Sequence, residues 1–183
     1  MTNIKFIALA VVALTAAASA AAQQPSPSPY AGQQDRPLKA LSDDEIKSYL
    51  NGEGMGYAKA AELNRYPGPR HVLDLASQLS LTELQRQRVS QIYKAMHADA
   101  VRLGTRIVRQ EAMLDSLFSG RTIDEQRLRA TVEDVARLQG ELRFTHLRAH
   151  LAVTRMLAPD QIMKYVELRG YAGDSTHAGH QHS

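Results

Sequence analysis

Apolar residues recur every three or four positions along two long stretches of the chain, which is the period of an amphipathic α-helix. The first stretch predicts a helix over residues 82–118, and the second predicts a helix over residues 122–157. Thr122 and Glu125 have the spacing of a capping box at the start of the second helix. At 1.5 Å per residue, a helix of about 36 residues measures about 54 Å. Because the break at Ser119-Gly120 is short, we expect the two helices to pair as an antiparallel hairpin.

Each predicted long helix carries one continuous stripe on a single face. Two helices cannot enclose stripes of this width by themselves, so we expect a homodimer that completes the core as a cradle-like bundle. The stripe of the first helix consists of Leu81, Leu84, Val89, Ile92, Met96, Leu103, Ile107, Leu114 and Leu117. The stripe of the second helix consists of Leu128, Val132, Val135, Leu138, Leu142, His146, Ala149, Val153 and Met156.

Shorter helices are predicted on either side of the hairpin. Ser42 and Glu45 have the spacing of a capping box, and Pro159 suits the first turn of a last helix. The predicted fold class is therefore all-α, a long antiparallel helical hairpin with short flanking helices, in one domain over residues 41–171. The short helices before the hairpin are expected over residues 42–51, 57–64 and 70–78.

The first residues have the pattern of a secretory signal peptide. Lys5 precedes a continuous apolar segment over residues 6–18, and Ala20-Ala21-Ala22 offers a small-residue cleavage site. An uncleaved anchor is the competing interpretation, but the apolar segment is short for a bilayer span. We therefore expect residues 1–22 to be removed, no stable membrane span after cleavage, and a periplasmic location.

Two terminal segments of the mature chain are expected to lie outside the packed domain. Residues 23–40 contain several prolines among Gln, Ser and Gly, which predicts a flexible arm. Residues 172–183 are polar and rich in histidine, which predicts a disordered tail.

The composition removes several classes of function. Cys is absent, which excludes a disulfide framework, a lipid-modified cysteine and a Cys nucleophile. The net charge is only +3, and no Lys/Arg run is interleaved with aromatic residues, so nucleic acid is not an expected partner. Nucleophile-elbow, H-E-x-x-H, P-loop and Rossmann motifs are absent, and the glycine-rich residues 52–56 follow no predicted strand. We therefore predict no enzyme activity.

An L-T-x-x-Q motif stands at the start of the first long helix and is nearly repeated at the last helix. Its first copy contains Leu81, Thr82 and Gln85, and its second contains Leu157 and Gln161 with Ala in the Thr position. Physically the motif is a helix start, because the Thr hydroxyl accepts from the Gln amide while the Gln side chain reaches back. The Leu anchors the entry to the core. The Ala in the second copy removes one cap, worth about 1 kcal/mol.

This motif pair, on a small exported helical hairpin without cysteine, resembles the Spy/CpxP family of periplasmic proteins over roughly residues 70–171. It also resembles the related heavy-metal resistors and sensors of the CnrX and ZraP type. The resemblance implies a long, bent hairpin that dimerises head-to-tail into a cradle. It further implies that the cradle holds unfolded proteins without ATP, restrains an envelope sensor kinase, or, in the metal branch, binds divalent metal.

A basic stripe with an apolar neighbour is the first candidate site. Arg102, Arg106 and Arg109 have i, i+4, i+7 spacing and share one face of the first long helix, and Arg143 adds charge on the second. With Met96 they are the candidate client-binding residues. Positive charge attracts acidic chains, while Arg stems and Met offer adaptable apolar contact. The alternative is a solvated face whose arginines pair with nearby carboxylates.

Histidines form the second candidate site. His146 and His150 have i, i+4 spacing on the second long helix, and His97 lies at a similar height on the first. Such a set suits Zn²⁺, Ni²⁺, Co²⁺ or Cu²⁺. A hydrogen-bonded core histidine is the alternative for His146, and no other feature requires a cofactor. The tail histidines, which could bind metal weakly or be solvated, are His177, His180 and His182.

These features predict an ATP-independent periplasmic chaperone or envelope stress-response protein of the Spy/CpxP type. Its expected partners are unfolded or partly folded envelope proteins, or an envelope sensor kinase. The alternative is a periplasmic heavy-metal-binding sensor or resistance protein that uses the histidines.

Overall fold

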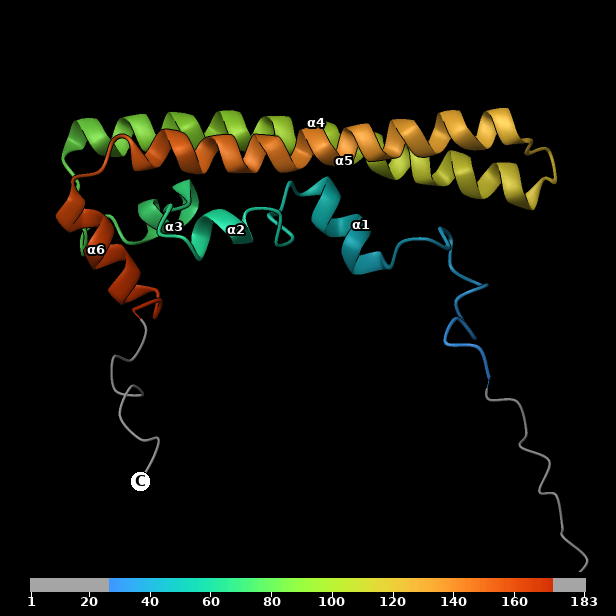
Figure 1. The fold of residues 1–183 in the computed structure, drawn as a ribbon, viewed down its shortest axis with the longest axis horizontal. Helices are drawn as coiled ribbons and strands as arrows, with labels where there is room; N and C mark the ends of the chain where they lie inside the picture. Colours follow the sequence, from blue (N-terminus) through green and yellow to red (C-terminus); the bar gives the residue numbers. More distant parts are fainter. Residues whose placement is uncertain (1–26, 173–183) are drawn as a thin grey trace, which may run out of the picture. The chain divides into compact units, whose positions relative to one another are not determined.

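The computed structural model describes residues 27–172, and this part of the chain is helical without any β-strand (Figure 1). The all-α fold class and the long helical hairpin are therefore confirmed. Residues 27–34 form a separate unit of hydrogen-bonded turns, and residues 35–172 form the unit discussed below. The predictions for residues 1–22 and for the three tail histidines lie outside the described residues. The helices are α1 (Asp43–Leu50), α2 (Lys59–Glu62), α3 (Pro69–Asp74), α4 (Glu83–Ser119), α5 (Glu125–Thr154) and α6 (Pro159–Leu168).

The two long helices, α4 and α5, lie side by side (Figure 1), and side-chain caps fix their N-terminal ends. Thr82 caps α4 as predicted, since its hydroxyl accepts from the Gln85 amide and the Gln85 side chain accepts from the Thr82 amide. The predicted cap of α5 is wrong. Asp124, not Thr122, caps this helix, because its carboxylate accepts from the amide of Arg127 at 2.8 Å. An ionised acceptor at a helix N-terminus also gains from the helix dipole.

The second helix is also shorter than the pattern predicts. α5 spans 30 residues and ends at Thr154, whereas α4 spans 37. The stripe continues past Thr154 because Leu157 is buried as well, but it belongs to the turn that leads into α6. Apolar periodicity reports burial, and a buried turn extends the pattern without extending the helix.

The two motif glutamines contact each other at the base of the hairpin. Gln85 Nε2 donates to Gln161 Oε1 at 2.9 Å, and Gln161 Nε2 donates back to Gln85 Oε1 at 3.1 Å. Each amide also donates to a backbone carbonyl, Gln85 to Met156 and Gln161 to Leu79. Gln161 accepts from the Ala158 amide at 2.9 Å, so the half of the cap that needs no hydroxyl is kept. The paired motif is thus one hydrogen-bonded joint between the starts of α4 and α6.

Residues 38–79, which we call the strap, add to the core of the hairpin and lie along one side of it (Figure 1). The strap and the hairpin approach each other closely at Gly104, where a Cβ atom would lie 2.1 Å from the carbonyl oxygen of Tyr49. One cluster joins the strap to mid-hairpin and consists of Leu38, Leu41, Tyr49, Ala100, Leu103, Ile107, Leu138 and Leu142. A second lies at the base and consists of Val72, Leu79, Val89, Val153, Leu157 and Tyr165.

The strap corrects two expectations about burial. The arm predicted over residues 23–40 is packed at its end, because Leu38 is only 5% exposed and Lys39 pairs with Asp115. Some stripe residues lie outside the core, with Leu84 at 56% exposed and Val132 at 47%. The stripe is wider than the strap and the partner helix cover. No helix among residues 27–172 is long and apolar enough to cross a membrane.

Candidate functional site

A cavity of about 460 Å³ lies between the strap and the base of the hairpin. The strap contributes the glycine-rich loop 52–56, α2 and the start of α3, and the hairpin contributes side chains of α4 and α5. Every histidine between residues 27 and 172 lines it: His71, His97, His146 and His150. The three histidines predicted to lie together on the hairpin therefore face one common space.

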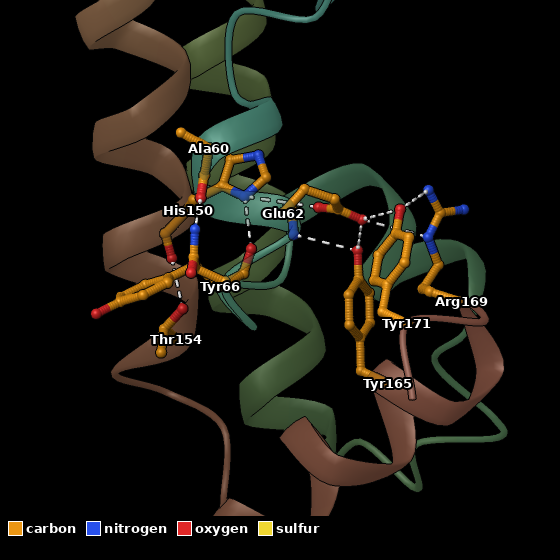
Figure 2. Close-up of polar contacts among 10 residues, drawn as sticks. Ala60, Glu62, Tyr66, His150, Thr154, Tyr165, Arg169 and Tyr171 are labelled. Atoms are coloured by element: carbon orange, nitrogen blue, oxygen red, sulfur yellow. Dashed lines mark hydrogen bonds and ion pairs between the residues drawn. The ribbon is translucent and has the colours of Figure 1, made fainter. Parts of the chain in front are cut away.

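One wall of the cavity is a polar network centred on Glu62 of α2 (Figure 2). Oxygen Oε1 of this carboxylate accepts from Tyr165 Oη, from Tyr171 Oη at 3.3 Å and from Arg169 Nε at 3.3 Å. Burial raises the pKa of Tyr165, and its hydrogen bond to Glu62 adds to this effect. The network ties the strap to α6 and its C-terminal flank.

His150 of α5 extends this network toward the hairpin (Figure 2). Its Nδ1 lies 2.7 Å from the carbonyl oxygen of Tyr66 and 3.7 Å from Glu62 Oε2. Because a carbonyl oxygen only accepts, Nδ1 carries the proton of this hydrogen bond. The ring borders Gly68, where a Cβ atom would lie 2.9 Å from Cε1 and 3.1 Å from Nε2, so a larger residue at position 68 would have to displace the ring.

His146 is the most deeply buried of the four histidines, at 4% exposed. Its ring stacks on Tyr57 with centroids 6.2 Å apart, and its Nε2 has no hydrogen-bond partner within the described part of the chain. Burial lowers the pKa of His146, and the neighbouring His150 lowers it further. The ring is therefore uncharged near neutral pH, as a core histidine would be.

The other two histidines lie nearer the surface of the cavity. The His97 ring packs beside Tyr93 with centroids 5.7 Å apart. Burial lowers the pKa of His71, and the positive charge of Arg169 adds to this effect. Among residues 27–172, no group of three or more His, Asp or Glu side chains is placed to hold a metal ion. The shared cavity thus brings the histidines together without forming a metal-binding cluster.

A second candidate site is the side of the hairpin away from the strap, which we call the outer face. Asp99 of α4 pairs with Arg102 on its own helix and with Arg148 across the hairpin, so the two arginines share one side. Arg102 stands about half a turn around α4 from Gly104, which packs on the strap, so this side faces away from the strap. Helical spacing adds further exposed residues of α4 and α5 to the same face. Together the outer face consists of Arg102, Arg106, Arg109, Met113, Phe144, Arg148 and Leu151.

Two predicted client-binding residues lie elsewhere. Met96 is buried at 9% exposed and lines the cavity, because it continues the stripe toward the strap. Arg143 lines a shallow pocket together with strap residues such as Tyr57 and Lys59. Its side chain therefore lies on the strap side of α5, whereas that of its neighbour Phe144 lies on the outer face. Neither residue belongs to the outer face, so the basic stripe predicted from the sequence is confined there to Arg102, Arg106 and Arg109.

Sequence reasoning missed the residues that complete both sites. Glu62 stands in a short helix without any recognisable motif, and its partners Tyr165, Arg169 and Tyr171 are about a hundred positions away in the sequence. Phe144 falls off the apolar stripe that contains Leu142 and His146, so the sequence marks it as an aromatic residue on the face expected to be polar.

Comparisons with known proteins give no further guide, since no family model, no curated protein and no solved structure matches this chain. The features of this chain that bear on function are the cavity, the outer face and the sequence motifs described above.

Proposed function

We propose that this protein is an ATP-independent chaperone of the bacterial periplasm, of the Spy/CpxP type, that holds unfolded or partly folded envelope proteins. The observation that carries the proposal is the composition of the outer face. Large apolar side chains stand exposed there, with Phe144 at 61%, Met113 at 55% and Leu151 at 45% exposed. Several large apolar side chains exposed on one face, among arginines, are typical of a surface that binds other proteins.

Arginines on the same face give this surface its second property. Arg106 and Arg109 are exposed and make no ion pair within residues 27–172, whereas Arg102 and Arg148 share the single carboxylate of Asp99. Positive charge attracts acidic chains at long range, and the aliphatic stems of Arg pack on apolar groups. Arg148 already lies over the ring of Phe144, 5.7 Å from its centroid. Weak, adaptable contact of this kind suits clients without a fixed shape.

A homodimer is part of the same proposal. Two copies would set two outer faces against one client and raise its effective concentration at the second face. An envelope sensor kinase that presents an acidic, apolar segment would use the same face.

The test is suppression of aggregation by the full mature chain. A chemically denatured client is diluted into buffer with the protein, and light scattering is followed at low salt. We expect suppression at a near-stoichiometric ratio, and most of it should be lost in the double variant Phe144→Ser/Leu151→Ser. The matched control is Leu63→Ser/Met163→Ser, which removes equally exposed apolar residues away from the outer face. No suppression at tenfold excess of the parent, or equal loss in both variants, contradicts the proposal.

As an alternative we propose a periplasmic metal-binding role, which the gathering of four histidines at one cavity supports. Calorimetric titration of a chain that ends at residue 172 with Zn²⁺, Ni²⁺ and Cu²⁺ tests it. Micromolar binding at a fixed stoichiometry supports a site on the helices. No binding to this chain confines any metal affinity to the tail histidines.

A further inference from the structure

The cavity has the size and lining of a site for a small organic molecule. Its volume of about 460 Å³ falls in the range of about 300–1,000 Å³ that is typical of ligand pockets. Thioether and aromatic side chains from both the strap and the hairpin line it. The tilted pair of Tyr93 and His97 offers ring surface, and Met96 lies in the same wall. Such groups favour a planar aromatic ligand.

The charges around the cavity favour an uncharged ligand. The charged residues that line it are Glu53, Lys59, Glu62 and Arg70, two of each sign. Glu62 is occupied by Arg169 and two tyrosine hydroxyls, and Glu53 accepts from Ser48 at 2.9 Å. Lys59 and Arg70 are exposed at the rim. Water screens these two cations at the rim, so an anion that moves past them into the cavity would lose more hydration than their charge returns.

Unpaired imidazole nitrogens supply the polar recognition. His97 is half-buried and makes no hydrogen bond within the described residues, and Nε2 of His146 has no partner. A neutral imidazole accepts a hydrogen bond through one nitrogen and donates through the other. The pKa values of His71 and His146 are lowered by burial, which keeps these rings neutral. A hydroxyl group on the ligand would satisfy one of these nitrogens.

The glycine-rich loop 52–56 provides a way in. Cβ atoms added at Gly54 and Gly56 would meet nothing within 4 Å, so this part of the loop is not packed against the rest of the chain. Gly52 is held by contrast, because a Cβ there would lie 3.0 Å from the Val101 side chain. The loop is thus anchored at one end and unpacked beyond it, beside the cavity.

We propose that the cavity between strap and hairpin is a binding site for an uncharged aromatic small molecule that carries a hydroxyl group, of the phenol or naphthol class. The ring lies against Tyr93, His97 and Met96, and the hydroxyl donates to an imidazole nitrogen. This site is separate from the outer face, so it does not depend on the chaperone proposal.

The test is titration of the full mature chain with 2-naphthol, followed by amide chemical shifts in NMR spectra. We expect saturable one-to-one binding with shifts that cluster in the loop 52–56 and around His97 and His146. The anionic 2-naphthoate should bind at least tenfold more weakly, and so should the saturated alcohol cyclohexanol. Shifts centred on Phe144 and Leu151 instead, or equal affinity for the anion, would overturn the proposal.

Two variants separate occupancy of the cavity from surface adsorption. Ala58→Phe places a ring in the cavity and should abolish binding, while its unfolding midpoint shows whether the fold is kept. His97→Phe keeps a ring beside Tyr93 but removes the hydrogen-bond acceptor, and it should weaken the binding of 2-naphthol about tenfold. The matched control Phe144→Leu on the outer face should bind like the parent. Unchanged affinity in both cavity variants contradicts the site, whatever the result of the aggregation assay.

Discussion

The same two helices form both sides of the hairpin, but one side is covered by the strap and the other is exposed to solvent. On the strap side, short helices cover α4 and α5 and enclose a buried polar network around Glu62. On the outer face, Phe144 and Leu151 stand in solvent among arginines. A stripe of apolar residues therefore becomes core only where another element covers it. The short helices pack on one side of the hairpin, and the other side stays open to a partner.

The largest difference in stability between the two sides is expected from Gly→Ala substitutions at two positions. Gly104→Ala would place a Cβ atom 2.1 Å from the Tyr49 carbonyl and must displace α1 from the hairpin. We expect a loss of about 3 kcal/mol in the free energy of unfolding, measured by urea denaturation. The matched control is Gly140→Ala on α5, where nothing lies within 4 Å, and it should stabilise by roughly 0.5–1 kcal/mol. Equal effects at both positions would refute the close contact of strap and hairpin.

A smaller effect is expected at the joint of the two motif glutamines. Gln85→Ala and Gln161→Ala each leave buried polar groups without a partner, and each should cost about 1–2 kcal/mol. Because the two amides bond to each other, the double variant should cost less than the sum, by about 1 kcal/mol. Additive losses in denaturant titrations would show that the two helix starts are stabilised independently.

The covered side and the outer face should also differ in how they affect the pH dependence of stability. Burial lowers the pKa of His146 in the folded chain, so the unfolded chain binds this proton more readily. Its contribution to stability is present above about pH 6.5 and declines as the pH falls below that value. The urea midpoint should therefore fall between pH 7.5 and pH 5, and fall less in His146→Phe. The pKa of His71 is lowered in the same direction, so part of the decline persists in the variant.

If the urea midpoint of His146→Phe declines with pH as steeply as that of the parent, His146 is not the buried group that titrates. Arg109→Gln on the outer face serves as the control and should leave the pH profile unchanged, since its side chain is exposed.

The smallest effect on stability is expected on the outer face itself. Arg106→Gln/Arg109→Gln should change the free energy of unfolding by no more than about 0.5 kcal/mol, because both side chains are exposed and make no ion pair within the described residues. The same double variant should bind acidic clients more weakly at low salt, and the difference should vanish at high salt. A large loss of stability would show that this face is structural.

Some helix starts could be predicted because they depend on neighbouring residues alone, whereas other features could not. The Thr82–Gln85 cap and the start of α6 at Pro159 depend on neighbouring residues only, and both were predicted. The cap at Asp124 was missed because Thr122 and Asp124 both fit a helix start, and the turn geometry chose between them. The spacing of Leu84 fits the stripe and predicts a core position, yet its side chain is 56% exposed.

The sequence by itself determined that this chain forms two long amphipathic helices with short helices around them, because helix period and capping are local properties. It also limited the chemistry, since a chain without cysteine has no thiolate to offer. Only the tertiary structure decided which face is covered, which places Met96 in a cavity and Phe144 in solvent. Glu62 meets Tyr165 across 103 positions for the same reason. Burial and hydrogen bonding between distant segments depend on how the strap packs, and no spacing along the chain encodes that directly.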